Sequence, residues 1–165
     1  MTHLRLIRRL ITPPGWQAPT VLRHGGLRAE ALTRHHLVDD VRGINASIRL
    51  IRRTRGGRWP TAPVTEESNY VDLVWHECEF RDKESFAYAV FAEERYIGNC
   101  YLYPVGRRTP ATPELLEHDV DLSWWVTPDA YAGGLYAALH RALNEWATTD
   151  FPFTHPHFSN IEMPA

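Results

Sequence analysis

The sequence of 165 residues lacks any long hydrophobic run, and it holds only two cysteines and a single lysine. A helix that crosses a bilayer needs about 18 or more consecutive apolar residues, and the sequence has no stretch of that kind. The apolar run LIRRLI near its start is too short and too charged for the core of a signal peptide. We therefore expect a cytoplasmic protein that makes no contact with a membrane.

The two cysteines, Cys78 and Cys100, do not have the spacing of a disulfide framework. The favoured interpretation is a pair of free thiols in a reducing compartment, with a disulfide as the alternative. His76 lies close to Cys78 in an expected helix, but residues at this spacing do not face each other. The remaining histidines form no better ligand set, so the sequence predicts no metal site.

The scarcity of lysine accompanies an uneven distribution of charge. The net charge is only −2, but residues 1–60 contain twelve arginines against three acidic residues, whereas residues 61–165 contain six basic and seventeen acidic residues. The densest basic run extends from Arg49 to Arg58, and a nucleic-acid-binding module would use such a patch for phosphates. No recognised docking motif accompanies the run, so a solvated helix face is the favoured explanation. Cofactor phosphates or an acidic acceptor would also account for part of it.

Hydrophobic periodicity predicts two amphipathic helices in the first half of the chain. The first begins after the candidate N-cap Thr33 and ends at Gly56-Gly57, and Gly43 is a point where it could kink or divide. Its apolar stripe consists of Leu37, Val41, Ile44, Ile48 and Ile51. The second begins at the candidate N-cap Thr65. Its expected apolar face consists of Val71, Val74, Trp75 and Cys78.

Aromatic and β-branched runs then predict an antiparallel hairpin of residues 86–91 and 96–103, in which Gly98 indicates a bulge or a close backbone approach. A third strand over residues 119–127 alternates between two faces. Val120, Leu122, Trp124 and Val126 lie on one face, and Asp121, Ser123 and Trp125 lie on the other. A third helix follows Gly133-Gly134, and a last extended piece begins at Phe151.

The order helix, helix, strand, strand, strand, helix, strand predicts one α/β (α+β) domain, with helices packed on a mostly antiparallel sheet. Residues 1–24 lack a sustained period and are expected to form an irregular arm. Residues 25–165 are expected to form the single domain, with a first strand near residues 24–31.

The segment most informative about function joins the third strand to the third helix, between residues 123 and 136. Pro128 ends the strand because it cannot donate to a β-ladder, and Gly133-Gly134 open the helix. A helix N-terminus presents unpaired N–H groups and a partial positive charge, and glycine there lets a phosphate approach the backbone. If the strand separates from its neighbour, a pantetheine-like arm could pair with the free edge. On spacing alone, an ordinary strand-to-helix turn is the more common explanation.

This segment resembles the cofactor-binding motif V-x-P-x-x-Q/R-x-x-G-x-G/A of the GNAT N-acetyltransferase superfamily, with Val126, Pro128 and Gly134 in register. The resemblance covers residues 25–158 and includes Trp59-Pro60 and the two strands of the hairpin. It implies a GNAT-like acyl-CoA N-acyltransferase fold. It also implies an N-acetyltransferase that moves the acetyl group of acetyl-CoA, its co-substrate, to the amine of a small-molecule or peptide acceptor by direct attack.

The resemblance also implies where the site lies. The expected cofactor-binding residues are Trp125, Val126, Thr127, Tyr131, Ala132, Gly133, Gly134 and Leu135. A backbone N–H near Trp125 and Val126 would stabilise the oxyanion. Asp119 and Asp121 on the third strand are candidate bases for the ammonium proton, and Glu77 is a remoter one. A solvated strand face is the alternative explanation of the two aspartates.

Two residues depart from the motif. Tyr131 stands in place of Gln or Arg, and Tyr136 stands in place of Gly or Ala. The elements that follow the last strand in a complete GNAT domain are expected to be abbreviated, and a homodimer could supply the missing wall. The alternatives are a GNAT-like domain that binds without catalysis and, less favoured, a nucleic-acid-binding module that uses the Arg49–Arg58 run.

Overall fold

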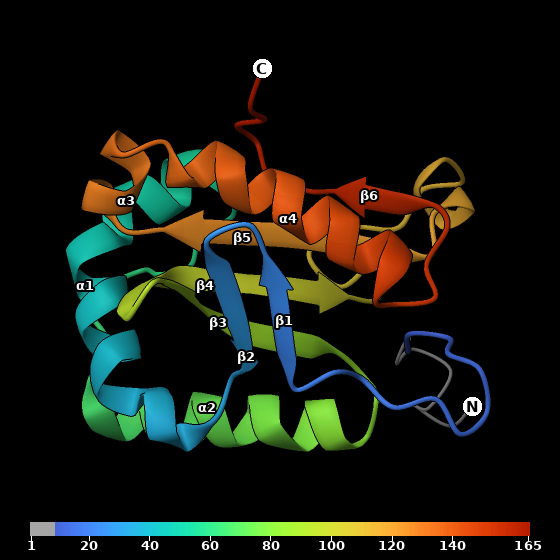
Figure 1. The fold of residues 1–165 in the computed structure, drawn as a ribbon, viewed down its shortest axis with the longest axis horizontal. Helices are drawn as coiled ribbons and strands as arrows, with labels where there is room; N and C mark the ends of the chain where they lie inside the picture. The colour runs from blue at the N-terminus through green and yellow to red at the C-terminus, as the bar shows by residue number, and fades with distance from the viewer. Residues whose placement is uncertain (1–8) are drawn as a thin grey trace.

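A single six-stranded sheet with helices on both faces forms the framework of the computed structural model, which describes residues 9–165 (Figure 1). The strands are β1 (Val21–His24), β2 (Leu27–Ala31), β3 (Phe86–Ala92), β4 (Arg95–Tyr103), β5 (Val120–Val126) and β6 (Pro156–Phe158). They lie side by side in chain order; β1 to β5 pair in antiparallel fashion, and β6 is parallel to β5. The predicted fold class is confirmed.

The helices divide between the two faces of the sheet. α1 (Leu37–Thr54) and α2 (Glu66–Arg81) pack on one face, and α4 (Leu135–Thr149) packs on the other. A short helix, α3 (Pro128–Ala132), leads into α4. In Figure 1, α4 crosses the top of the view and α2 lies along the bottom. Each face therefore has its own hydrophobic core, with the sheet between them.

The helix boundaries follow the predicted caps in part. Thr65 caps α2 by accepting a hydrogen bond from the N–H of Ser68, as predicted. Thr33 caps a 3-10 turn, Arg34–His36, that precedes α1. Gly43 does not divide α1, which runs unbroken through it. A Cβ at Gly43 would lie 2.6 Å from the ring of Tyr96, so the glycine lets α1 approach β4 closely.

Both edges of the sheet differ from expectation. The irregular arm was expected to reach residue 24, but Val21–His24 forms β1 and pairs with β2 across the turn at Gly25-Gly26. Only Leu22 of β1 is buried, so the sequence of this edge strand has too little hydrophobic periodicity to predict it. The last strand begins at Pro156, later than the expected start at Phe151. Residues 1–8 of the expected arm lie outside the described residues.

The expected apolar face of α2 is wrong. Val71 and Trp75 are 57% and 63% exposed, whereas the helix buries Asn69 and Leu73. The reason is a buried polar contact: the side-chain amide of Asn69 donates a 2.7 Å hydrogen bond to the carboxylate of Asp40 on α1. A polar residue with a buried partner can face a core. The side of α2 that faces the core therefore differs from the side that hydrophobicity alone predicts.

The predicted alternation along β5 is confirmed. Trp124 lies in the core under α4, and Trp125 lies in the core under α1 and α2. Gly98 on β4 has a φ of 151°, and a Cβ there would lie 2.0 Å from the carbonyl oxygen of Trp125. The predicted close backbone approach at Gly98 is therefore present, and the neighbouring β3–β4 register shifts between Val90 and Phe91.

Within residues 9–165, no helix combines the length and apolarity that a membrane crossing requires. The same part of the chain contains no group of three or more His, Cys, Asp or Glu side chains placed to hold a metal ion. Cys78 and Cys100 are both free thiols, and Cys100 is buried.

Candidate active site

β5 and β6 pair over only part of their length. Their ladder covers Val120 to Leu122 of β5 and ends at Phe158 of β6. Beyond it, the side chain of Asn160 takes the place of a strand: its Oδ1 accepts from the N–H of Trp124 at 3.1 Å, and its Nδ2 donates to the C=O of Trp124 at 3.0 Å. By alternation the N–H and C=O of Val126 point to the same edge, and no described residue bonds them. The edge of β5 is therefore open at Val126.

The open edge leads directly to a helix N-terminus. α3 begins with Pro128 at its first turn, Gly133 follows its end, and Gly134 is the N-cap of α4 with a φ of 81°. The first N–H groups of α4 have no acceptor within the helix and carry partial positive charge. Gly133 and Gly134 are exposed, so an anionic group can reach these N–H groups.

The predicted cofactor residues lie together at this junction, with one exception. Residues 126–127 and 131–135 surround the open edge and the start of α4. The N–H and C=O of Trp125 point to β4, because those of Trp124 point to the opposite edge. The indole of Trp125 donates a 2.9 Å hydrogen bond to the hydroxyl of Tyr101 in the core under α1 and α2. Of the two residues expected to offer an oxyanion donor, only Val126 has its N–H at the open edge.

A hollow of about 430 Å³ lies beside α2, on the face of the sheet that α1 and α2 cover. Its aromatic lining consists of Trp59, Trp75, Tyr101 and Tyr103. Arg55 forms part of its wall: the guanidinium lies 4.2 Å from the ring of Tyr101 and donates to the hydroxyl of Ser123 on β5 at 3.2 Å. Because Ser123 pairs with Tyr101 across the strands, the hollow lies over the part of β5 that precedes the open edge.

His76 on α2 also lines this hollow. Its Nδ1 is buried and has no hydrogen-bond partner among the described residues. Its Nε2 lies 3.9 Å from the carboxylate of Asp72. Burial lowers the pKa of His76 below its ordinary value of 6.5, and the nearby carboxylates oppose the shift. The imidazole is therefore neutral at neutral pH and can accept a proton.

The two aspartates that were expected to act as bases, Asp119 and Asp121, have different surroundings in the structure. Asp119 precedes β5 at the end remote from the junction, and its carboxylate accepts from the backbone N–H groups of Thr154 and His155 at 2.8 and 3.0 Å. These contacts give it a structural role in the turn before β6. Asp121 is buried and accepts a hydrogen bond from the hydroxyl of Ser159. Burial raises the pKa of Asp121, and the Ser159 hydrogen bond opposes that shift.

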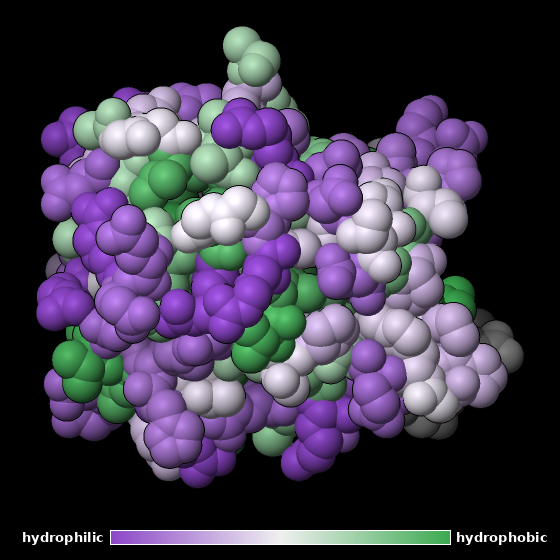
Figure 2. Space-filling view, viewed as in Figure 1, coloured by the Kyte–Doolittle hydropathy of each residue, from purple (hydrophilic) through white to green (hydrophobic). Residues whose placement is uncertain are grey.

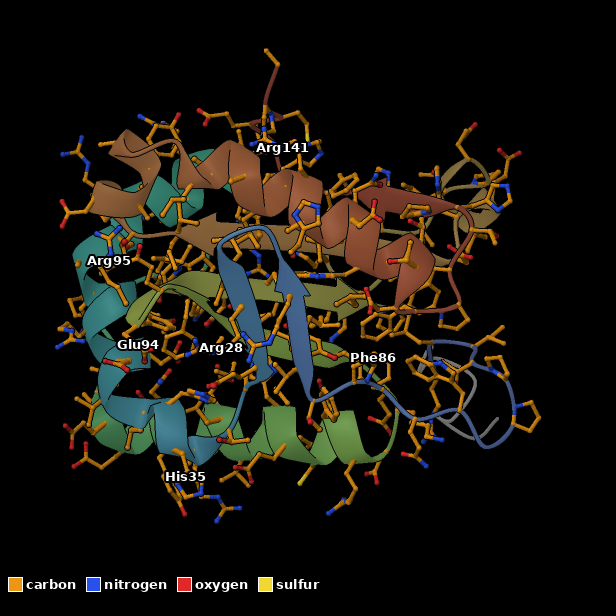
Figure 3. The ribbon with its side chains drawn as sticks, viewed as in Figure 1. Arg28, His35, Phe86, Glu94, Arg95 and Arg141 are labelled. Carbon is orange, nitrogen blue, oxygen red and sulfur yellow. The ribbon has the colours of Figure 1, made fainter. Side chains whose placement is uncertain are left out.

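Glu77, the remoter candidate base, is occupied elsewhere. Its carboxylate accepts a 2.7 Å hydrogen bond from the guanidinium of Arg34, in an exposed ion pair at the start of α1. A larger hollow, of about 1060 Å³, lies between the β1–β2 turn, the β3–β4 turn and α4, and Leu135 at the start of α4 is part of its lining. Glu94, Arg95 and Arg141 surround it (Figure 3). Its face of the molecule is mostly hydrophilic (Figure 2).

The basic run divides into two parts. Arg49, Arg52, Arg53 and Arg58 are exposed, whereas Arg55 is buried and holds Ser123. Arg53 reaches the junction, where its guanidinium lies 5.3 Å from the ring of Tyr131. Neither Arg55 nor His76 was singled out from the sequence as a site residue. Periodicity places both on helices, but it carries no information about which strand they face.

No protein-family model matches the chain, and no curated protein matches it significantly. Solved structures do match it. The alignment with RimL, the ribosomal L7/L12 alpha-N-protein acetyltransferase in complex with coenzyme A, covers 79% of this chain and 70% of RimL, with a TM-score of 0.61 and 11% identity. That with a putative ribosomal-protein-serine acetyltransferase from Vibrio cholerae covers 87% and 75%, with a TM-score of 0.62 and 9% identity. That with Mycobacterium smegmatis RimJ in complex with CoA-disulfide covers 80% and 61%, with a TM-score of 0.58 and 11% identity.

At these identities the likeness is a likeness of fold, and fold alone does not fix function. It nevertheless agrees with the geometry: a six-stranded sheet, a parallel β5–β6 pair that separates beyond Leu122, and a glycine junction that opens α4. The chain therefore has the acyl-CoA N-acyltransferase fold of the GNAT superfamily.

Proposed function

We propose that this protein is an acetyl-CoA-dependent N-acetyltransferase whose acceptor is the primary amine of a peptide or small molecule. The observation that carries the proposal is the open edge of β5 at Val126, which lies directly before the N-terminus of α4. The amides of a pantetheine arm would pair with such an edge as a strand does. The diphosphate would then lie against the first N–H groups of α4, where negative charge is stabilised.

The chemistry is a direct transfer. The neutral amine nitrogen attacks the thioester carbonyl carbon, so a C–N bond forms and the carbonyl oxygen becomes an oxyanion. The free N–H of Val126 would donate to that oxyanion. The C–S bond then breaks, and CoA leaves as a thiolate that takes up a proton. No covalent enzyme intermediate is needed, which agrees with the burial of Cys100.

The amine would enter from the hollow over Tyr101 and Tyr103. An ammonium ion cannot attack until it loses a proton, so the acceptor site needs a base. His76 offers one, because its side chain lines the hollow and burial holds its imidazole neutral. Asp72 would stabilise the imidazolium that forms, since its carboxylate lies 3.9 Å from Nε2. We therefore assign proton removal to His76, directly or through one water.

The nature of the similar structures supports the choice of cofactor and acceptor. Two of them are complexes with CoA or a CoA disulfide, and two are described as acetyltransferases of ribosomal proteins. A peptide amine is therefore the first acceptor class to test. The aromatic and charged lining of the hollow suits an extended peptide end better than an apolar molecule.

The test is a matched pair of substitutions at Gly133, which is exposed and has an ordinary backbone conformation with a φ of −83°. Gly133→Glu places a carboxylate beside the proposed phosphate site, and Gly133→Gln adds nearly the same volume without charge. We expect calorimetric titration with acetyl-CoA to show at least about tenfold weaker binding for the Glu variant than for the Gln variant. Equal affinities for the two variants would contradict phosphate binding at this helix.

A CoA-binding domain without catalysis is the second candidate. It is favoured by Tyr131 and Tyr136, which depart from the motif at the junction. The two candidates differ in one measurement. Release of free CoA thiol from acetyl-CoA in the presence of peptide amines indicates a transferase, whereas binding without release indicates the second candidate.

A further inference from the structure

The segment Asn160–Glu162, hereafter the latch segment, lies against the candidate cofactor groove and is held by α1 and α4 as well as by β5. The N–H of Glu162 donates to the C=O of Thr54, at the end of α1, at 3.0 Å. The hydroxyl of Tyr136 on α4 donates to the C=O of Glu162 and accepts from the amide of Asn160 at 2.7 Å. The latch segment thus bridges the two helices that flank the open edge of β5.

The side chain of Glu162 makes a further set of contacts at the junction. The hydroxyl of Tyr131 donates to Oε2 of Glu162 at 2.6 Å. The guanidinium of Arg53 lies 3.8 Å from Oε1 of the same carboxylate. An arginine and a hydroxyl around one anion are the groups that a phosphate oxygen would also use. Glu162 therefore occupies an anion position beside the start of α4.

The two tyrosines that depart from the motif are the two that hold Glu162. Tyr131 stands where the motif has Gln or Arg, and Tyr136 stands where it has Gly or Ala. Their rings lie 5.4 Å apart, and each hydroxyl ends on the latch segment. The departures and the latch segment thus form one contact set, in which the hydroxyl of each tyrosine donates to Glu162.

We propose that the latch segment is an internal competitor of the cofactor. Glu162 occupies the anion position between Arg53 and Tyr131 that a CoA phosphate would take, and Tyr131 and Tyr136 keep it there. This inference rests on the proposed function. CoA can bind only to molecules in which the latch segment is open, so its apparent affinity falls in proportion to that open fraction. A latch segment held closed by a few hydrogen bonds would therefore weaken CoA binding by about tenfold.

The test uses the full chain with free CoA as the probe. Glu162→Ala removes the carboxylate, and Tyr131→Phe removes only the hydroxyl that binds it. We expect Glu162→Ala to bind CoA about threefold to tenfold more tightly than the unaltered protein in calorimetric titrations. Tyr131→Phe is expected to gain less than Glu162→Ala, because the hydroxyl that it removes would also donate to the phosphate. Glu145→Ala, at an exposed position on α4, is the matched control and is expected to leave the affinity unchanged.

A second readout separates the latch from the proposed function. In the unaltered protein, saturation with CoA is expected to accelerate hydrogen exchange of the Glu162 amide, because its bond to Thr54 must open. CoA binding with equal affinity in all variants and an unchanged Glu162 amide would overturn the latch and leave the proposed function standing. No CoA binding by any folded variant, Glu162→Ala included, would overturn both.

Discussion

The side-chain amide of Asn160 makes the two hydrogen bonds to Trp124 that a neighbouring strand would make, one to its N–H and one to its C=O. Both partners are buried. The ladder with β6 has already ended at this point, so one side chain extends the backbone pairing of β5 as far as Trp124. The stability of the fold and access to the open edge of β5 therefore both depend on Asn160.

Asn160→Ala is expected to lower the free energy of unfolding by about 1–3 kcal/mol, because two buried backbone groups lose their partners. The measurement is urea denaturation followed by the fluorescence of the buried tryptophans. Asn144→Ala, on the exposed side of α4, is the control and is expected to change the free energy by less than about 0.5 kcal/mol. Similar losses in both variants would show that Asn160 does not carry the pairing.

A buried polar cluster joins α1, α2 and β4 beneath the aromatic hollow. One oxygen of the Asp40 carboxylate accepts from the Tyr96 hydroxyl at 2.9 Å and from the Asn99 amide at 2.7 Å, and the other oxygen accepts from Asn69 at 2.7 Å. Asp40 is only 3% exposed. Removing the carboxylate would leave the buried amide of Asn69 without an acceptor and that of Asn99 with only a 3.5 Å contact to the Tyr101 hydroxyl, and an unpaired buried donor is costly.

We expect Asp40→Ala to lower the free energy of unfolding by about 3 kcal/mol, as measured by chemical denaturation. The neighbouring residue provides the control. Asp39 is half-exposed and pairs with Arg42 one turn away, so Asp39→Ala is expected to cost less than about 1 kcal/mol. The prediction fails if the two alanine variants are equally stable.

The sequence predicted those elements whose packing is local and periodic. α4 buries one apolar stripe and β5 alternates between two cores, so hydrophobicity alone located them. α1 was located as a helix, but of its expected stripe it buries only Ile44 and Ile51, beside the polar residues Asp40, Ser47 and Thr54. Hydrophobicity failed for α2, because the inward face of that helix carries Asn69, and its partner Asp40 lies 29 positions earlier in the chain. Burial of a polar side chain depends on such distant partners, which no local pattern contains.

In the candidate site, too, the sequence predicted the contiguous part and missed the residues that distant segments contribute. The junction from Val126 to Leu135 is contiguous in sequence, so a motif could indicate it. Arg55, His76 and Glu162 come from three remote segments and meet the site only through the order of the strands and the packing of α1 and α2. Tyr131 and Tyr136 looked like defects in the motif, but the structure gives each hydroxyl a partner in the latch segment.

A pH-dependent contribution to stability is expected from Glu79 on α2. Burial raises the pKa of its carboxyl, but hydrogen bonds of 2.6 Å from Arg107 and from Ser85 outweigh burial, and the net pKa lies below the ordinary value of 4.5. A carboxyl with a lowered folded-state pKa stabilises the protein above its ordinary pKa. That contribution is lost as the pH falls through the folded-state pKa.

Glu79→Gln is therefore expected to lower the free energy of unfolding by about 1 kcal/mol at pH 7 and to have a smaller effect at pH 3. Urea denaturation of both proteins at the two pH values measures the difference. The same substitution at the exposed Glu145 controls for the loss of one charge and is expected to have a small effect at both pH values. A constant difference between Glu79→Gln and the unaltered protein would contradict the assignment.

His76 gives the sharpest prediction for activity. Four charged groups influence its ring: Asp72 and Glu79 on α2, Asp40 on α1 and Arg107 after β4. Burial is the largest influence, and it places the pKa of His76 below 6.5. If His76 accepts the proton of the amine, the rate at subsaturating acceptor must rise with pH through that pKa and level off above it.

His76→Gln keeps a polar side chain of similar size but cannot act as a base. We expect kcat/KM for a peptide amine to fall by about 100-fold, and the rise at low pH to disappear. The thiol released from acetyl-CoA measures the rate, and calorimetry with CoA confirms that the cofactor still binds. His35→Gln, at an exposed position before α1, is expected to keep both the rate and the profile. If the His76→Gln variant keeps the unaltered pH profile, another group removes the proton, and the hollow over Tyr101 and Tyr103 then serves to bind the acceptor rather than to activate it.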